Sequence, residues 1–491
     1  MLRFSNLVAL GGVVIIVAFA STAAASFLGS SDDTEPPARR IGIGAREVAA
    51  PEAEPTGATM TSSMAHHATA DPAAEAPPHD PAAYERNLAL ITGASVRNDS
   101  HDRSLHRDTP LQDLVIEDHL GPRQDYLGEV GGNIEMSFPI AEGGQFRAGC
   151  EFSHFAYDDP LVAPGHPGGS HLHMFFGNTD VNAHSTYETL SNSGSSTCNG
   201  QELNRTGYWV PAMFDAAGNI RVPERVVVYY KGEGRSQGAS EPYPPEAAMI
   251  ATENLNTRSW DRGGAAGKFS FVCSDQWSGT AEPQADTIPV CDGDRFFDLY
   301  GVTDRPHVVL EMNVKFPQCW SGDDPANWAS SYAVPEIGDW YGSQCPDSHP
   351  VNLPNLEYFV NYRVDVGETT DGWYLSSDID PTTFELAGEP GHSTHGDWWG
   401  GWHPEINQTW IDECVNVRAE PVSGCGFGYL SDGGPDPQNP FDGPALAVRP
   451  QYEGPHKVPF TLVYGELCQP HTDRVATQPQ EAAHCVVGDD Q

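Results

Sequence analysis

The run HVVLEMNVKF, from His307 to Phe316, and the run LEYFVNYRV, from Leu356 to Val364, are rich in β-branched and aromatic residues. Such residues favour strands, and Gly, Pro and Asp turns separate runs of this kind along the chain. We expect a strand in each of eight runs, which are Ile134–Phe138, His171–Phe176, Tyr208–Pro211, Arg225–Tyr230, Lys268–Cys273, His307–Phe316, Leu356–Val364 and Pro459–Tyr464.

Helical patterns are few in the same part of the chain. One helix is expected over Pro404–Val417, where Pro404 suits the first turn and apolar residues recur on one face. The 50 Gly, 41 Pro and only 39% hydrophobic residues also suit a protein rich in loops. The sequence therefore predicts a mainly β fold, an antiparallel sandwich or jelly-roll-like domain with long loops and a few short helices.

The charge balance is strongly acidic. The 491 residues include 26 Lys plus Arg against 68 Asp plus Glu, which gives a formal net charge of −42. Because neutralising phosphates requires clustered Lys and Arg, this balance excludes a surface that coats nucleic acid. Adaptation to high salt and a genome that favours Arg and Asp explain the acidic composition equally well.

The N-terminal part of the chain predicts export. Residues 1–25 have the pattern of a signal peptide, with Arg3 before the apolar core Leu7–Ala20 and small residues after it. We therefore expect a secreted, extracellular protein that has no membrane contact after signal cleavage, and an uncleaved anchor is the alternative. Residues 26–123 are acidic and rich in Pro and Ala, which predicts a disordered leader before a disulfide-bonded domain over residues 128–491.

The cysteines support export, because an even number in an exported chain indicates disulfide bonds. Pairing in sequence order is the simplest arrangement, although the sequence alone leaves the connectivity open. The ten cysteines are Cys150, Cys198, Cys273, Cys291, Cys319, Cys345, Cys414, Cys425, Cys468 and Cys485.

The first cluster of chemically active residues lies in DDPLVAPGHPGGSHLHMFFGN, from Asp158 to Asn178. His171 and His173 are two residues apart, so on a strand both rings would project from one face. That arrangement is a common route to two converging metal ligands or to a histidine pair that lines a cleft. The alternative is a pair of hydrogen-bonded histidines without a ligand.

The second cluster is GHSTHGDWWGGWHPE, from Gly391 to Glu405, where His395 and Asp397 are again two residues apart. We interpret this stretch as a turn-rich loop. Aromatic rings beside His and Asp are a reasonable set of sugar contacts, because flat rings stack on pyranose faces and carboxylates accept hydroxyl hydrogen bonds. The predicted substrate-binding rings are Trp398, Trp399 and Trp402. The alternative is that the tryptophans are core residues and that His395 is structural.

The third cluster spans residues 316–362. A disulfide between Cys319 and Cys345 would close a loop and bring Trp320 and His349 near one another. Both are therefore further candidates for substrate binding, and a structural role is the alternative for His349.

Taken together, these clusters resemble a family of secreted microbial and fungal proteins described as domain of unknown function 1996. The matching segments are DPLVAPGHPGGSHLHMFFGN, TCNGQELNRTGYWVPAMF, VVVYYK, FPQCWSG, CPDSHPVNLPNLEY and HGDWWGGW, and the resemblance covers roughly residues 146–430. The acidic leader and the stretch from Gly426 onward depart from the family pattern. The resemblance implies an extracellular domain, sometimes found beside carbohydrate-binding modules, but no established reaction.

The leading hypothesis is a carbohydrate-active protein, a hydrolase or lyase that acts on a polysaccharide or cell-wall glycan. His171, His173, His395 and Asp397 would surround one cleft, with Asp397 or a histidine as general acid or base. The first alternative is a non-catalytic extracellular module that binds a glycan.

The second alternative is a metal-dependent enzyme. His171, His173 and His395 would bind a divalent metal, and Asp397 would be a fourth ligand or a carboxylate beside the other three. The cofactor is otherwise unknown from the sequence.

Overall fold

The computed structural model describes residues 106–116, 118, 145–232, 239–251, 269–274, 284–295, 307–335, 344–416, 424–426 and 454–460. Among these residues the fold is mainly β, as predicted, with four sheets that are antiparallel except for one parallel pair, β1 with β17. Two α-helices are present in this part of the chain, α4 (Tyr187–Asn192) and α6 (Pro404–Trp410).

The largest sheet has six strands in the order β17 (Gly424–Gly426), β1 (Gln145–Cys150), β7 (Arg225–Lys231), β14 (Asn355–Asp365), β10 (His307–Lys315) and β9 (Phe269–Ser274). Its central strands alternate in burial, as a sheet with one face on the core requires. In β10, for example, Met312 and Val314 are fully buried, whereas Glu311 and Asn313 between them are partly exposed.

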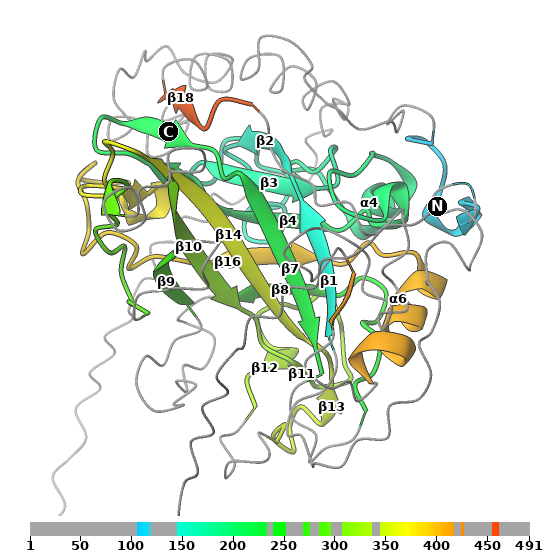
Figure 1. Ribbon diagram of the computed structural model, residues 1–491. Helices are drawn as coiled ribbons and strands as arrows, with labels where there is room; N and C mark the ends of the chain where they lie inside the picture. Colours follow the sequence, from blue (N-terminus) through cyan, green and yellow to red (C-terminus); the bar gives the residue numbers. More distant parts are fainter. Residues whose placement is uncertain are drawn as a thin grey trace, which may run out of the picture. The chain divides into compact units, whose positions relative to one another are not determined.

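The second large sheet has five strands in the order β2 (Phe152–Ala156), β3 (His173–Gly177), β4 (Gly207–Pro211), β16 (Gly396–Trp399) and β8 (Ala248–Ala251). One face packs against the six-stranded sheet (Figure 1). The Tyr358 hydroxyl on β14 donates to the Asp397 carbonyl on β16 at 2.7 Å, and the hydroxyls of Tyr208 on β4 and Tyr230 on β7 are 2.8 Å apart. These contacts tie the two sheets together.

The opposite face of the five-stranded sheet carries a second apolar cluster, which includes Phe175, Trp209 and Trp399. Because strand side chains alternate, His173 and Asp397 project from this same face. The chain between β2 and β4, including α4, contributes Val181 and Leu190 to the cluster. The side chains of His173 and Asp397 therefore lie outside the main core, on the face of the sheet that the chain between β2 and β4 covers.

Two smaller sheets and short helical turns complete the described fold. The sheets are β15 (Tyr374–Leu375), β5 (Met213–Phe214), β6 (Asn219–Arg221) and β18 (Lys457–Pro459), and then β12 (Tyr332–Ala333), β11 (Cys319–Trp320) and β13 (Val351–Asn352). The turns are 3-10 helices η1 (Leu111–Asp113), η2 (Gln201–Leu203) and η4 (Ser376–Asp378), and a π-helical turn η5 (Ile411–Val415) that continues α6.

Most expected strands correspond to observed ones, with shifts of one or two residues at their ends. The expected strand His171–Phe176 begins at His173, and the helix predicted over Pro404–Val417 is α6 with its π-helical continuation. The stretch interpreted as a turn-rich loop contains a strand, β16, because it pairs with β4 and β8 on both sides. The expected strand Ile134–Phe138 lies outside the described residues, as do the residues after 460.

Three of the five disulfide bonds predicted by sequence order are present, namely Cys150–Cys198, Cys273–Cys291 and Cys319–Cys345. Cys414 is also disulfide-bonded. Cys468 and Cys485 lie outside the described residues. The described part of the chain contains no helix of the length and apolar character needed to cross a membrane. The predicted signal peptide lies outside the described residues.

A short segment upstream of the sheets packs onto them. Leu111 and Leu114 are only 2% and 6% exposed and belong to the main core. The buried guanidinium of Arg205 donates to backbone carbonyls of His106 and Thr109 at 2.7 and 2.6 Å. This segment falls within residues 26–123, which the sequence assigns to a disordered leader. The ordered chain therefore includes residues before the expected domain start at 128.

Candidate metal centre

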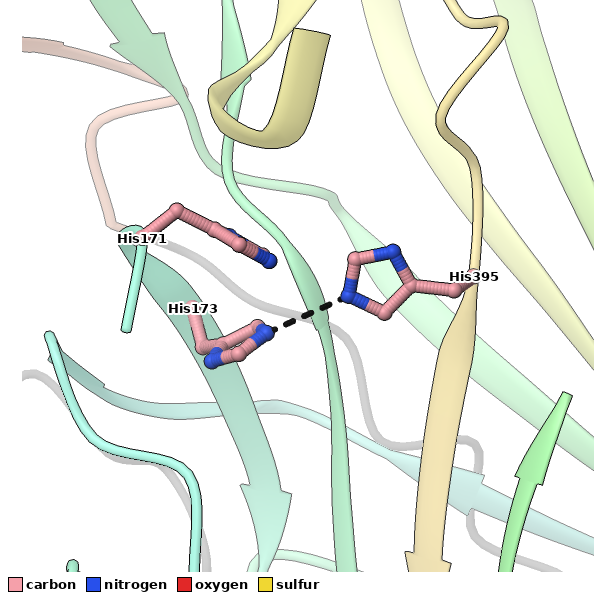
Figure 2. Close-up of side chains that lie close together, drawn as sticks. All are labelled: His171, His173 and His395. Atoms are coloured by element: carbon pink, nitrogen blue, oxygen red, sulfur yellow. Dashed lines mark hydrogen bonds between the residues drawn. The ribbon is translucent and has the colours of Figure 1, made fainter. Parts of the chain in front are cut away.

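Two histidines come from the strands that flank β4 on either side. His173 is the first residue of β3, and His395 directly precedes β16. Their Nε2 atoms lie 3.4 Å apart, and Figure 2 shows His171 pointing toward the same space. One nitrogen from each of the three rings lies within 4.8 Å of the others. The structure thus joins two histidine motifs that are more than 200 residues apart in the sequence.

Backbone carbonyls determine the tautomers of His173 and His395. His173 Nδ1 lies 2.9 Å from the Asp158 carbonyl oxygen, and His395 Nδ1 lies 2.9 Å from that of Ser393. A carbonyl can only accept, so each Nδ1 carries the proton and donates it. In the neutral rings both Nε2 atoms therefore present a lone pair to the shared space. Burial lowers the pKa of His395 to about 4, so this ring is neutral at pH 7.

His171 is oriented by the hydroxyl of Ser376, at the start of η4. The Ser376 hydroxyl donates to the Leu172 carbonyl at 2.6 Å and accepts from the Ala212 N–H at 3.1 Å. Because the hydroxyl proton is used in this way, His171 Nδ1, 3.1 Å away, acts as the donor to the Ser376 oxygen. All three rings thus have Nδ1 protonated. His173 and His395 are at most 2% exposed, whereas His171 is half-buried and opens the cluster toward solvent.

Two carboxyl groups lie next to the histidines. One carboxyl oxygen of Asp159, one carboxyl oxygen of Asp397 and one ring nitrogen of His173 all lie within 4.8 Å of one another. Asp397 Oδ2 is 3.9 Å from His395 Nε2, is buried, and has no hydrogen-bond partner among the described residues. Burial, and then the charge of Asp159, raise the pKa of Asp397 well above its usual range. Burial also raises the pKa of Asp159 to about 6, although the backbone N–H groups of Leu161 and Val162, which donate to its Oδ1, oppose this shift.

The buried carboxylate of Asp378 holds the two loops that orient the histidines. Its Oδ2 accepts from the N–H groups of Leu375 and Gly391 at 2.8 and 2.7 Å. Its Oδ1 accepts from the Ser393 hydroxyl at 2.6 Å. Burial would raise the pKa of Asp378, but hydrogen bonds from His392, Ser393, Gly391 and Leu375 lower it below its usual value. A charged Asp378 therefore links the acceptor of His395 to the turn that contains Ser376.

The donor set matches what a zinc-like ion requires. Two nitrogens bound to one tetrahedral zinc at 2.0–2.1 Å would be about 3.3 Å apart, and the observed separation of His173 and His395 Nε2 is 3.4 Å. Metal-bound histidines commonly donate their other N–H to a carbonyl or hydroxyl oxygen, as all three do here. Three imidazoles with an adjacent carboxylate can therefore hold a divalent transition-metal ion.

The three tryptophans predicted to contact a sugar are largely buried. Trp398 is 0% exposed and packs against Tyr243, with ring centroids 4.6 Å apart. Trp399 and Trp402 are 8% and 7% exposed, and the Trp402 ring meets Phe146 edge-on at 5.6 Å. None presents a broad open ring face, because β16 directs alternate residues into the two apolar clusters.

Trp320 lies in β11 and in the loop closed by Cys319–Cys345, whereas His349 follows Cys345 by four residues. His349 is partly exposed, and its ring contacts the Ser330 carbonyl at 3.0 Å and the Ser348 hydroxyl at 2.9 Å. These contacts place His349 against the disulfide-closed loop and not in the histidine cluster.

Sequence reasoning missed Asp159, Ser376 and Asp378. Asp159 stands beside Asp158 at the start of the first cluster, so the acidic pair was a visible signal. Ser376 and Asp378 lie in YLSSDID, which contains no motif that distinguishes them from other polar turns. Their role depends on which distant loops fold onto η4.

Comparison with curated proteins finds no match, and comparison with solved structures finds none either. A family model does match. The model described as Domain of unknown function (DUF1996) matches residues 159–402, a span that begins at Asp159, contains His171, His173 and His395 and ends at Trp402, so this part of the chain is similar to the DUF1996 family.

Proposed function

We propose that this domain is a metal-dependent extracellular enzyme with a three-histidine metal centre of the zinc type. The observation that supports this most strongly is the pair of Nε2 lone pairs 3.4 Å apart, with both Nδ1 protons committed to carbonyls. Two lone pairs at this distance repel each other unless a metal ion or a proton lies between them. A bound cation would remove that repulsion and would also pair with the buried Asp397 carboxylate.

Metal-assisted hydrolysis is the reaction class that suits the residues around the centre. A zinc-type ion supplies Lewis acidity, and three protein ligands leave a position open for substrate. Asp397, 3.9 Å from His395 Nε2, is placed to accept or return a proton at the reacting group. A carboxyl oxygen of Asp159 lies within 4.8 Å of one of Asp397. His171 is the partly exposed ligand, so substrate would enter on its side.

A glycan substrate and secretion are part of this proposal. The disulfide bonds support an oxidising, extracellular location. The choice of a glycan comes from the sequence, where His and Asp stand among aromatic and glycine residues. The buried positions of Trp398 and Trp399 mean that ring stacking beside the metal does not contribute to this argument.

The first experiment measures metal content by elemental mass spectrometry on untagged, disulfide-bonded protein. We expect close to one zinc, copper or manganese ion per wild-type chain and none in a His173→Ala, His395→Ala variant. His349→Ala is the matched control, because this partly exposed histidine is outside the cluster and its variant should keep the metal. Equal metal content in all three proteins, or none in the wild type after zinc reconstitution, would contradict the proposal.

Activity is tested separately on the zinc-loaded protein with a panel of plant, fungal and bacterial polysaccharides. We expect turnover that disappears in Asp397→Asn while the metal remains bound. Metal binding without turnover of any polysaccharide would contradict the glycan part of the proposal but not the metal centre.

A further inference from the structure

A pocket lies at the C-terminal end of β16, and none of the clustered histidines lines it. It has a volume of about 210 Å³, and its lining includes Trp398 and Trp402 from the end of β16 and the following loop, and Asn407 and Gln408 from α6. Tyr187, Tyr243 and four prolines complete its apolar walls. Pockets for drug-sized ligands measure roughly 300–1,000 Å³, so this one suits a single small ring.

The lining contains no Asp, Glu, Lys, Arg or His. A charged ligand would lose its hydration here without gaining a partner of opposite charge, which is costly. This is notable in a chain with 68 acidic residues, where an acidic rim is the ordinary surface. The pocket therefore selects for a neutral ligand.

Two polar atoms of the lining residues lack a hydrogen-bond partner among the described residues. They are Oδ1 of Asn407, an acceptor, and Nε1 of Trp398, a donor, and both atoms are buried. The Asn407 amide nitrogen donates to the Tyr243 carbonyl at 3.2 Å, which fixes Oδ1 as the remaining acceptor. A ligand hydroxyl can donate to the Asn407 oxygen, whereas a purely apolar ligand would leave this acceptor unpaired.

The walls of the pocket are held in place before any ligand arrives. The Trp402 indole N–H donates to the Tyr230 hydroxyl at 3.0 Å, and Trp398 packs against Tyr243. Prolines restrict the backbone that forms the opposite wall. A ligand would therefore bind without first ordering the site, which favours affinity.

From the neutral lining, the apolar walls and the buried acceptor, we infer that this pocket binds one neutral pyranose unit of a glycan. The apolar C–H face of the sugar would lie against Tyr187 and the prolines, and one of its hydroxyls would donate to Asn407. The site is distinct from the metal centre, because none of His171, His173, His395, Asp159 and Asp397 lines the pocket. It stands whether or not the domain is an enzyme.

The test measures binding of neutral oligosaccharides by calorimetry in the presence of a metal chelator, so that the metal centre has no part in the result. The probes are cellohexaose, chitohexaose, laminarihexaose and mannohexaose, with oligogalacturonate as the anionic comparison. The protein comes from a non-glycosylating host, because Asn407-Gln408-Thr409 is a glycosylation sequon.

Two variants test the pocket, and one serves as the control. Gln408 is exposed, so Gln408→Trp should fold normally and fill the pocket, abolishing binding. Asn407→Ala removes the acceptor and should weaken binding about tenfold. Thr409→Ala changes the next residue of α6, outside the pocket, and should bind as the wild type does. Binding that survives Gln408→Trp, a preference for oligogalacturonate, or no binding of any neutral probe would overturn the inference.

Discussion

At the scale of single residues, Asp378 shows how one buried carboxylate can organise a site that it does not enter. It binds Ser393, whose carbonyl accepts from His395, and Leu375, which precedes the Ser376 that orients His171. Losing a direct hydrogen-bond partner of a metal ligand typically weakens metal binding about 10- to 100-fold, and Asp378 holds two such partners in place. The residue thus has a positioning role for the proposed centre.

We expect Asp378→Asn to weaken zinc binding by about 10- to 100-fold, measured by competition with a chromophoric chelator. The amide cannot accept all the hydrogen bonds that the carboxylate accepts, so the two loops would shift apart. Asp380→Asn is the control, because Asp380 is partly exposed and its carboxylate accepts from the N–H groups of Thr382 and Thr383 within its own turn. Unchanged zinc affinity in a folded Asp378→Asn variant would show that the loops are held by other contacts.

His154 provides a pH-dependent prediction at the same scale. Its Nε2–H donates to the Val181 carbonyl at 2.8 Å, and its ring stacks on Phe175. Burial lowers its pKa from 6.5 to about 4. Between pH 6.5 and pH 4, His154 is protonated in the unfolded chain and neutral in the folded chain. The free energy of unfolding therefore falls as the pH decreases through this window, by about 3 kcal/mol in all.

We therefore expect a His154→Gln variant to lose about 3 kcal/mol less stability than the wild type between pH 6.5 and pH 4, as measured by urea unfolding at each pH. Other groups that titrate in this range, such as His395 and Asp159, are present in both proteins and cancel in the comparison. Parallel pH profiles for the two proteins would mean that His154 is hydrated or already charged in the folded state.

At the scale of elements, long strands could be predicted from the sequence and short ones could not. The nine residues of β10 and the eleven of β14 contain enough β-branched and aromatic side chains for each strand to be predicted from its own sequence. The four-residue strand β16 begins with a glycine and is followed by two more, and its pairing with β4 and β8 depends on residues about 150 to 190 positions earlier in the chain. Local sequence favoured a loop there, and tertiary pairing overrode it.

The candidate site follows the same rule. The histidine and Asp397 motifs were visible because two ligand-type residues at strand spacing stand in an unusual glycine and aromatic context. That they surround one space is now seen in the geometry. Ser376 and Asp378 act through backbone groups of other loops, and nothing in their own neighbourhood of the sequence specifies those partners.

Arg205 fastens the upstream segment to the C-terminal end of α4. Its guanidinium donates to five backbone carbonyls, those of His106, Arg107, Thr109, Ser191 and Gly194. Burial lowers its pKa only to about 10, so it stays charged at neutral pH. One side chain thereby joins residues 106–109 to the chain that follows α4.

We expect Arg205→Met to reduce the free energy of unfolding by about 3 kcal/mol, because several buried carbonyls lose their donor. Arg205→Lys should be nearly as damaging, since an ammonium cannot reach five acceptors. The upstream segment should also become the first site of limited proteolysis. If Arg205→Lys were as stable as the wild type, charge rather than the array of hydrogen bonds would hold the segment.

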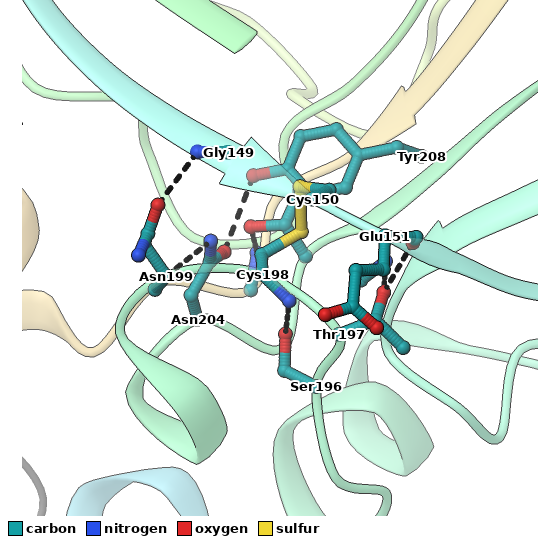
Figure 3. Close-up of a disulfide and its surroundings, with 12 residues drawn as sticks. Gly149, Cys150, Glu151, Ser196, Thr197, Cys198, Asn199, Asn204 and Tyr208 are labelled. Carbon is teal, nitrogen blue, oxygen red and sulfur yellow. Dashed lines mark hydrogen bonds between the residues drawn. A yellow bond between two sulfur atoms is a disulfide. The ribbon is translucent and has the colours of Figure 1, made fainter. Parts of the chain in front are cut away.

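At the scale of the whole molecule, the disulfide Cys150–Cys198 joins the last residue of β1 in one large sheet to the loop that leads into the other (Figure 3). Around it, Asn199 Oδ1 accepts from the Gly149 N–H, and the Thr197 hydroxyl donates to the Glu151 carbonyl. The bond therefore fastens a boundary between layers where backbone pairing is already present.

Removing this disulfide should cost more than removing a shorter one. It closes a loop with a sequence separation of 48, against 18 for Cys273–Cys291. From loop entropy alone we expect double alanine variants to lose about 4 and about 3 kcal/mol respectively, measured by urea unfolding under oxidising conditions. The hydrogen bonds around Cys150 and Cys198 remain after substitution, so the fold should persist and both proteins should still show the same metal content. If the Cys273→Ala, Cys291→Ala variant were the less stable of the two, native contacts at that bond would outweigh the difference in loop length.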